Sequence, residues 1–416
     1  MLDFFVKYDT IETTMNTYNI AFFADSHLGY RAKVRSNEQG INIRVQDGYD
    51  AFRETIEQII TSKDKVDAVV HGGDLFHYSK PTIRDIATAQ FYLRELAKRD
   101  IPFYGLAGNH DATDIRSELA AVAAVNDPDK NIYALYEPYM QYELTDGIVL
   151  HSVSHHGLGA DEAPKVKPVT GSLNLFTTHG AALDPKNKNL MRCADSPREQ
   201  MVPIELIIDD AFVAKMLGHY HSRYPVGGDV LKTYYAGSSI RRGFSDEVGD
   251  RGWLMFKIHP DGKVDVEAHN ISQRSQFDLD VIDAIDLTPS DVMNLLEINT
   301  KRTLDTGDEP IVRQRIINAP RSIREALDRE KINDLTSHML MWQLEFVKPE
   351  VDKTTKNIEG ISISNRHSIN IVDQYKTWSE ERSKTVPEEY REAVMADAEK
   401  YLQEARNLDL LEGHSH

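Results

Sequence analysis

The chain has 416 residues, of which 41% are hydrophobic and 27% charged, and its formal net charge is −18. This length predicts two or three domains, and the composition is that of a globular protein without an apolar run of the roughly 20 residues that cross a bilayer. The first residues lack the basic start and the cleavage site of a signal peptide, and the single cysteine, Cys193, excludes an internal disulfide. We therefore expect a cytoplasmic protein without a membrane partner.

The acidic balance argues against a protein that holds nucleic acid by bulk charge alone, because nucleic-acid binders carry basic patches. Basic residues cluster at Arg31, Lys33 and Arg35 and again at Arg241 and Arg242, but a solvated surface is the simpler interpretation of either cluster. Bound metal ions can invert the local field, so the balance leaves room for a polyanionic substrate.

Residues 1–16 are expected to form an extension before the first strand. Short apolar runs then predict strands, and apolar residues at helical spacing predict helices around Phe52–Ile60 and Ile83–Leu96. Residues 31–47 are predicted to be a polar loop. This alternation is typical of parallel strands joined by right-handed crossovers in one sheet. The strands are expected at 18–24, 68–71 and 103–107.

From about residue 131 onward, several further short strands are predicted. They indicate a second sheet, so that two sheets, one from each half, would form a layered α/β sandwich covered by helices. The expected strands include Gly147–His151, Leu173–Thr178, Phe212–Leu217, Thr233–Ser239 and Trp253–Ile258.

A smaller α/β unit is predicted at 275–348. Its helices are expected near 288–302, with Ser290 as the N-cap, and at 321–333. Residues 349–416 are expected to be a charged linker followed by a one-faced helix, and a helix with no sheet to cover favours binding to a partner. The strands of the smaller unit are expected at Phe277–Val281, Ile311–Ile317 and Met339–Val347.

Polar side chains follow the ends of five predicted strands. The strand at 68–71 stops at a glycine turn that delivers Asp74, and open α/β folds keep their ligands at this carboxyl edge of a sheet. Residues two apart in an extended chain point to one side, so Asp25 with His27, and His219 with His221, can each aim two ligands into one cleft. The full set is Asp25, His27, Asp74, Asn109, His110, His179, His219 and His221.

Carboxylate, imidazole and amide ligands together suit Mn²⁺, Fe or Zn²⁺ better than Ca²⁺. Even without His110, the seven remaining ligands are too many for one ion with open positions. They suit two ions about 3.5–4 Å apart that share one carboxylate, an arrangement used for displacement at phosphorus, and Asp74 is the natural shared group. Other histidines lack this context: His155 and His156 are interpreted as loop residues, and His71 as a packed strand residue.

These stretches resemble the five motifs of calcineurin-like metallophosphoesterases, and the resemblance covers roughly residues 17–260. Finer features resemble the SbcD-type nuclease family of DNA double-strand-break repair, whose members work with an SMC-like coiled-coil ATPase. The five motifs are Asp25-Ser26-His27, Gly73-Asp74, Gly108-Asn109-His110-Asp111, His179 and Gly218-His219-Tyr220-His221. The finer features are His27-Leu28-Gly29-Tyr30, Gly73-Asp74-Leu75-Phe76-His77 before Pro81, and Ala236-Gly237-Ser238 with Arg241 and Phe244.

The resemblance implies a calcineurin-like sandwich at 17–270, a capping domain at 275–348 and an ATPase-binding tail within 349–416, and we expect a homodimer. It implies that His110 stabilises the transition state or protonates the leaving oxygen, that Asp111 orients the His110 ring, and that His77 positions DNA for exonuclease cleavage. It also implies two divalent ions, most readily Mn²⁺, the first held by Asp25, His27, Asp74 and His221 and the second by Asp74, Asn109, His179 and His219.

The resemblance therefore predicts a DNA nuclease, a 3'-to-5' exonuclease on duplex ends and an endonuclease on single strands. Because the chain is so acidic, we expect the ATPase partner to supply much of the grip on DNA. One alternative is a phosphodiesterase or phosphatase for small phosphoesters, against which the capping unit and the tail count. The other is an inactive scaffold that recruits the ATPase to DNA, against which the complete ligand set counts. The segment 155–171 matches nothing in the family.

Overall fold

Two six-stranded sheets make up the larger part of the chain in the computed structural model. The structure describes residues 16–112, 119–160, 164–184, 186–187, 199–228, 231–246 and 248–347. The predictions for the N-terminal extension, for the linker and for the helical tail therefore lie outside the described residues.

The first sheet has the strand order β12-β11-β1-β2-β3-β4. Strands β1, β2 and β3 are parallel neighbours, as the alternating pattern predicts. Strand β4 extends this parallel set, although strands from about residue 131 onward were expected in the second sheet, and β11 and β12 run antiparallel. The strands are β1 (Tyr18–Phe23), β2 (Ala68–His71), β3 (Phe103–Leu106), β4 (Ile132–Leu135), β11 (Gly252–Ile258) and β12 (Val264–Asn270).

The second sheet has the order β5-β6-β7-β8-β10-β9, with β6, β7, β8 and β10 parallel. Two sheets flanked by helices confirm the predicted α/β sandwich. The strands are β5 (Tyr139–Thr145), β6 (Ile148–Val153), β7 (Leu173–His179), β8 (Phe212–Gly218), β9 (Tyr224–Val226) and β10 (Thr233–Tyr235).

One strand belongs to a different sheet from the one predicted. Strand β11 was expected in the second sheet, but it pairs with β1 in the first. Trp253 packs with the core under the helices, whereas Leu254 and Phe256 pack between the sheets. An apolar run that is buried on both faces carries no signal of which sheet it joins, so the sequence pattern could not decide between them.

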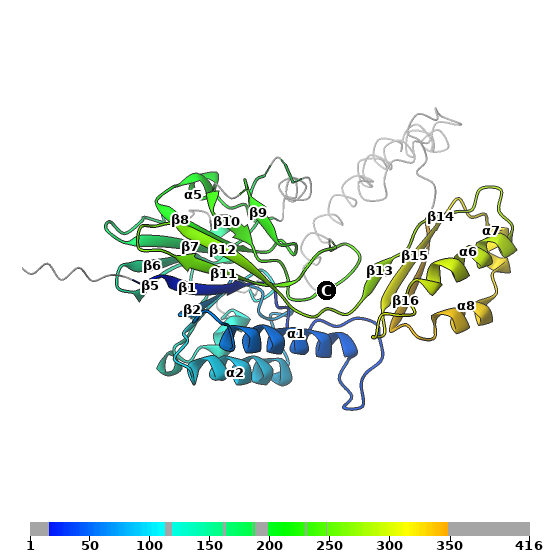
Figure 1. Cartoon of the computed structure of the whole chain (residues 1–416), viewed down its shortest axis with the longest axis horizontal. Coiled ribbons are helices and arrows are strands. Elements are labelled where there is room, and N and C mark those ends of the chain that lie inside the picture. Colours follow the sequence, from blue (N-terminus) through cyan, green and yellow to red (C-terminus); the bar gives the residue numbers. More distant parts are fainter. Residues whose placement is uncertain are drawn as a thin grey trace, which may run out of the picture. The chain divides into compact units, whose positions relative to one another are not determined.

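Each face of the first sheet has its own apolar core. The face toward the second sheet contributes Ile20 and Phe22 to a core shared with Leu175 and Met216. The other face is covered by α1 (Ile43–Ile60) and α2 (Ile83–Ala97), which lie side by side below the sheet in Figure 1. The short helix α5 (Ile204–Ile208) adds Ile207 to a third core on the outer face of the second sheet.

Two helices begin at residues other than those predicted, because a side-chain cap fixes where each helix starts. Helix α1 begins at Ile43, inside the expected loop 31–47, because the Asn42 side chain accepts a hydrogen bond from the Arg44 N–H group. The expected helix at 321–333 is two helices, α7 (Arg321–Ala326) and α8 (Arg329–Thr336), and Asp328 caps the second.

Strands β13 (Gln276–Asp278), β14 (Ile282–Asp283), β15 (Ile311–Ile317) and β16 (Met341–Val347) form a separate four-stranded sheet, here called the small sheet. Helices α6 (Pro289–Lys301), α7 and α8 pack against it around their own apolar core. Helix α6 is capped by Thr288 in a capping box with Asp291, not by Ser290, because Pro289 occupies the first helical position.

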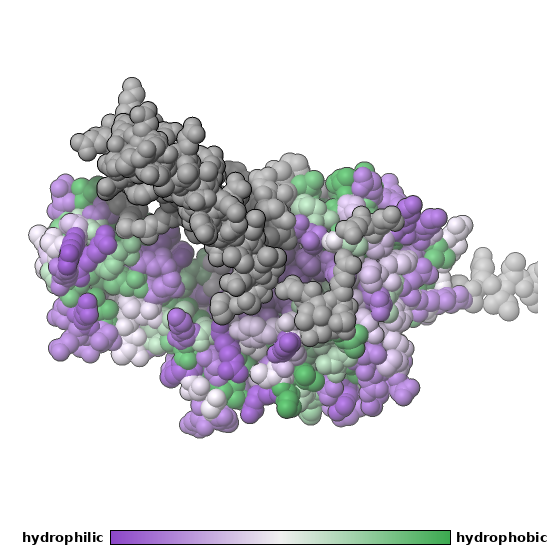
Figure 2. Space-filling view, turned by 180° about the vertical axis from the view of Figure 1, so that it is seen from behind, coloured by the Kyte–Doolittle hydropathy of each residue, from purple (hydrophilic) through white to green (hydrophobic). Residues whose placement is uncertain are grey.

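No helix within the described ranges is long and apolar enough to span a membrane. On the face shown in Figure 2, hydrophilic side chains cover most of the described surface and hydrophobic ones lie scattered among them.

Candidate metal centre

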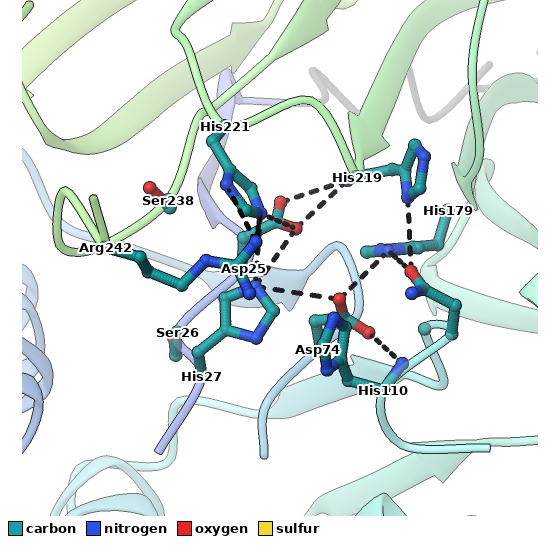
Figure 3. A network of polar contacts seen from close by, with 12 residues as sticks. Asp25, Ser26, His27, Asp74, His110, His179, His219, His221, Ser238 and Arg242 are labelled. Carbon is teal, nitrogen blue, oxygen red and sulfur yellow. Dashed lines mark hydrogen bonds and ion pairs between the residues drawn. The ribbon is translucent and has the colours of Figure 1, made fainter. Parts of the chain in front are cut away.

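The structure brings all seven predicted ligands together at the carboxyl ends of the parallel strands of both sheets (Figure 3). The first sheet supplies the groups that follow β1, β2 and β3, and the second sheet supplies those that end or follow β7 and β8. We call this group the strand-end cluster: Asp25, His27, Asp74, Asn109, His179, His219 and His221.

The backbone of the strand-end cluster is held in an uncommon conformation. Four of its residues have left-handed φ values: Asp25 at 51°, His27 at 45°, Asp74 at 56° and His219 at 101°. Such backbone costs on the order of 1–3 kcal/mol for each residue and persists only where the surroundings fix it. Here the Asp25 N–H donates to the Gly73 carbonyl and the His27 N–H to the Asp74 carbonyl, both at 2.9 Å. Strain concentrated in this way marks a functional site.

Two glycines make room for the cluster. A Cβ atom at Gly108 would collide with Asp74 Oδ1, and one at Gly73 would collide with the ring of His179. Gly73 also has a φ of +102°, which side chains rarely tolerate. The glycines of the sequence motifs are therefore required by the close approach of the ligands.

The first group of ligand atoms consists of Asp25 Oδ1, His27 Nε2 and His221 Nε2. The two nitrogens are 3.2 Å apart, and Asp25 Oδ1 lies 3.9 Å from His27 and 3.6 Å from His221. Atoms that bind one ion at about 2.0–2.2 Å lie about 3–3.5 Å from one another in a tetrahedral or octahedral shell, so this group fits one divalent ion with little adjustment.

The second group consists of Asn109 Oδ1, His179 Nε2 and His219 Nδ1. Asn109 Oδ1 lies 3.0 Å from the His179 nitrogen and 3.1 Å from the His219 nitrogen. Asp74 Oδ2 is 3.4 Å from His179 Nε2 and 3.7 Å from His27 Nε2, so the same oxygen borders both groups. This geometry suits a carboxylate that bridges two ions.

Three of the four histidines in these groups have their second ring nitrogen beside a carbonyl or carboxylate oxygen, and in the fourth, His27, it lies beside a ring nitrogen of His77. Metal-bound histidines show this arrangement, which fixes the tautomer and the ring orientation. The contacts are His27 Nδ1 with His77 Nδ1 at 3.4 Å, His179 Nδ1 with the Gly72 carbonyl at 2.8 Å, His219 Nε2 with Glu199 at 2.6 Å and His221 Nδ1 with Asp246 at 3.1 Å. The residues present therefore fit a pair of divalent ions.

Burial and neighbouring charges set the protonation of the cluster. Burial, reinforced by nearby cations, holds the pKa of His27 well below its usual value, so the ring is neutral, as a metal ligand must be. Burial also acts to lower the pKa of His179, but the Asp74 carboxylate outweighs it and raises that pKa to about 9. An ion bound at His179 would displace this proton, so metal uptake there is coupled to proton release.

His110 lies against the shared carboxylate. Its backbone N–H donates to Asp74 Oδ1 at 2.8 Å, and its Nδ1 atom lies 2.8 Å from the His77 carbonyl oxygen. The His110 and His77 rings stack at 4.9 Å with 23° between their planes. Because Nδ1 is engaged by a carbonyl, Nε2 is the nitrogen left for a substrate.

The structure revises the prediction for Asp111. Its buried carboxyl accepts backbone N–H bonds from Leu75 at 3.2 Å, Phe76 at 3.0 Å and Gly108 at 3.1 Å, whereas the His77 carbonyl orients His110. Burial and the nearby Asp74 raise the pKa of Asp111 to about 7 despite these three bonds. Asp111 thus ties together the two loops that follow β2 and β3.

His155 also differs from its prediction as a loop residue. It opens the short helix α3 (His155–Leu158), its Nδ1 lies 3.0 Å from the His179 carbonyl oxygen, and its ring faces His219 at 6.0 Å. Strand β6 extends to Val153, two residues beyond the predicted end, so the rule that polar residues follow strand ends could have found His155. His71 is buried against Phe23 and Phe103, as expected of a packed strand residue.

Three further residues of the site carry no motif in the sequence. Glu199 and Asp246 contact the two histidines after β8, and the Arg242 Nη2 atom lies 3.1–3.2 Å from both ring nitrogens of His221. They come from loops whose sequence shows neither periodicity nor ligand spacing.

Comparison with known families identifies this centre. The profile described as calcineurin-like phosphoesterase matches residues 18–270, a span that contains the whole strand-end cluster. The chain belongs to the calcineurin-like phosphoesterase family. As a calcineurin-like phosphoesterase, it is a metal-dependent enzyme that hydrolyses phosphoesters.

Several relatives within this family carry the name DNA double-strand break repair protein Mre11. The protein from Sulfurisphaera tokodaii is 29% identical over 216 residues, which are 50% of each chain. The one from Halobacterium salinarum is 30% identical over 283 residues, 64% of this chain and 62% of the relative. The one from Methanosarcina acetivorans is 40% identical over 89 residues, 21% of this chain and 13% of the relative. The chain thus spans about half the length of the first of these relatives.

Among solved structures, the nuclease MPE of Pseudomonas putida aligns with 39% of this chain and 62% of its own, at 13% identity and a TM-score of 0.21.

Proposed function

We propose that this calcineurin-like phosphoesterase is a DNA nuclease of double-strand-break repair, with 3'-to-5' exonuclease activity on duplex ends and endonuclease activity on single strands. The observation that carries the proposal is a complete strand-end cluster with His110 and His77 stacked beside it, inside a span that resembles Mre11-named relatives. The resemblance of the sequence to the SbcD-type nuclease family agrees with it.

The donor set supports divalent ions of the transition series, and we propose Mn²⁺. Two such ions, when bound, supply a water nucleophile at neutral pH and neutralise charge on the phosphate. Asp25, His27 and His221 would hold the first ion and Asn109, His179 and His219 the second, with Asp74 shared. The positive charge of the ions would also draw a phosphodiester toward a chain whose formal net charge is −18.

The two stacked histidines would act on the substrate. His110 is held by the Asp74 carboxylate and the His77 carbonyl, to which its Nδ1–H would donate. As an imidazolium, protonated on both nitrogens, it would donate from Nε2 to the phosphoryl oxygen or to the leaving 3' oxygen. The His77 ring lies against both His27 and His110, where it would position duplex DNA for exonuclease cleavage.

We also propose roles for the parts of the chain outside the sandwich. The small sheet with α6 to α8 would be a capping domain at 275–348, and the segment 349–416 would carry a linker and an ATPase-binding helix. A homodimer is supported by apolar side chains on α2, where Ile83 is 86% and Phe91 58% exposed. A cytoplasmic location and an SMC-like coiled-coil ATPase partner complete the proposal.

The test uses end-labelled duplex DNA and a circular single strand, each incubated with the full chain and Mn²⁺. We expect cleavage of both, and a loss on the order of 10²–10³-fold in His110→Ala. His259→Ala is the matched control. His259 follows Ile258, which pairs with Tyr18 at the amino end of β1, whereas the cluster lies at the carboxyl ends of the parallel strands. Hydrolysis of small phosphoesters without cleavage of either DNA, in the wild type, would overturn the nuclease proposal.

A further inference from the structure

Two carboxylates outside the strand-end cluster contact its last two histidines. Glu199 lies on the segment before α5, and Asp246 lies on the loop before β11. The two contacts are made to His219 and His221, which lie two residues apart in the sequence but belong to different ligand groups.

Glu199 faces the outer nitrogen of His219. Its Oε2 atom lies 2.6 Å from His219 Nε2, and the other nitrogen, Nδ1, lies 3.1 Å from Asn109 Oδ1. The segment that carries Glu199 is fixed beside the end of β7, since the Ala181 N–H donates to the Gln200 carbonyl and the Val202 N–H to the Ala181 carbonyl, both at 2.9 Å. The contact is therefore made from an anchored backbone.

Asp246 faces the outer nitrogen of His221 in the same way. Its Oδ1 atom lies 3.1 Å from His221 Nδ1, and its Oδ2 atom accepts the Arg242 backbone N–H at 2.9 Å. His221 Nε2 points inward, 3.2 Å from His27 Nε2. The Arg242 Nη2 atom lies within hydrogen-bond distance of the same ring, 3.1 Å from His221 Nε2 and 3.2 Å from His221 Nδ1.

The two contacts require opposite tautomers. An ionised carboxylate only accepts hydrogen bonds, so the proton of His219 lies on Nε2 and that of His221 on Nδ1. The inward lone pairs are then Nδ1 of His219 and Nε2 of His221. His27 and His179 also point Nε2 inward, so His219 is the single ring of the four that would bind through Nδ1.

We propose that Glu199 and Asp246 are positioning residues, one for each ion, which fix opposite tautomers of His219 and His221 and so tune the affinity of the two ions separately. This inference rests on the two-ion part of the proposed function and is independent of the nature of the substrate. Loss of such a partner weakens metal binding by about 10–100-fold.

The first experiment is a calorimetric titration of the metal-free full chain with Mn²⁺ alone. In Glu199→Gln we expect one of the two ions to bind about 10–100-fold more weakly while the other is unchanged, and in Asp246→Asn we expect the opposite ion to weaken. Glu205→Gln and Asp261→Asn are matched controls at exposed sites and should bind both ions as the wild type does. Unchanged thermal unfolding in a chelator verifies that each variant folds.

The second experiment identifies the nitrogens. Long-range ¹H–¹⁵N spectra of the chain labelled with ¹⁵N-histidine and loaded with Zn²⁺ should show one ligand ring bound through Nδ1 among rings bound through Nε2. That one pattern should change in Glu199→Gln and persist in Asp246→Asn.

The inference is overturned if either variant weakens both ions equally or neither, or if all ligand rings bind through the same nitrogen. A chain that shows the expected metal binding yet leaves DNA intact would refute the nuclease proposal alone. A chain that binds a single ion would refute the inference together with the two-ion site.

Discussion

The strand-end cluster and the small sheet differ in where their charged side chains lie: they are buried in the cluster and partly exposed on the small sheet. In the cluster, Asp25, His27, Asp74 and His179 are buried and their backbone is partly left-handed. In the small sheet, Arg313 and Arg315 share Asp278 at 2.7 and 3.1 Å on a partly exposed face of regular strands. A site built against local backbone preference is held by the rest of the fold, whereas no strand residue of the small sheet has a left-handed φ. Substitutions in the cluster should therefore alter ion binding, and those in the small sheet should alter stability.

The largest effect is expected at Asp74. In Asp74→Asn the oxygen shared by both ligand groups loses its charge, so both ions should bind far more weakly and hydrolysis should fall on the order of 10³-fold. Calorimetry with Mn²⁺ and a cleavage assay measure the two losses. Wild-type affinity for either ion would contradict the bridging role.

The expectation that substitutions in the small sheet alter stability is tested at Leu296, which is 1% exposed in the apolar core beside that sheet. Leu296→Ala should lower the free energy of unfolding by about 2–5 kcal/mol, through lost burial and the cavity left behind, while the stoichiometry of ion binding stays unchanged. Urea unfolding monitors the first and calorimetry the second. Its neighbour Leu295, 36% exposed, provides the control: Leu295→Ala should change stability by no more than about 0.5 kcal/mol.

His77 sharpens the comparison, because its side chain touches the cluster without belonging to it. His77→Ala should reduce exonuclease activity on duplex ends by about 10²-fold, since a displaced substrate loses its alignment. Endonuclease activity on a single strand should fall much less. Parallel assays on the two substrates separate these effects. An equal loss on both substrates would indicate that His77 acts by orienting the ligand His27, because the Nδ1 atoms of the two rings lie 3.4 Å apart.

The smallest effect is expected at the start of α6. Thr288→Ala removes the cap and should cost about 1 kcal/mol of stability, whereas Ser290→Ala, two residues further into the helix, should cost little. Urea unfolding of both variants distinguishes the cap seen in the structure from the one that the sequence favours. A larger cost for Ser290→Ala would reverse that assignment.

The convergence of the seven candidate ligands could be predicted from the sequence, because each one ends or follows a strand and the sheets bring the strand ends together. Strand β15 was predicted with its observed bounds because β-branched residues stand at both of its ends, Ile311-Val312 and Ile316-Ile317. Asp111 was misinterpreted since neighbours in the chain need not be neighbours in space: its carboxyl turns to three backbone N–H groups and away from His110. Glu199 and Asp246 could not be predicted, because a partner that arrives on an irregular loop leaves no spacing to detect.

The left-handed backbone of the strand-end cluster affects which substitutions this protein would accumulate if only its stability were selected. Glycine adopts such φ values at no steric cost, so His27→Gly should relieve the backbone while it destroys a ligand. A random library selected for thermal stability alone should therefore accumulate glycine at Asp25, His27 and Asp74 before it changes the apolar cores, and sequencing the survivors would show it. The centre would be the first part of the molecule to disappear once function ceased to protect it.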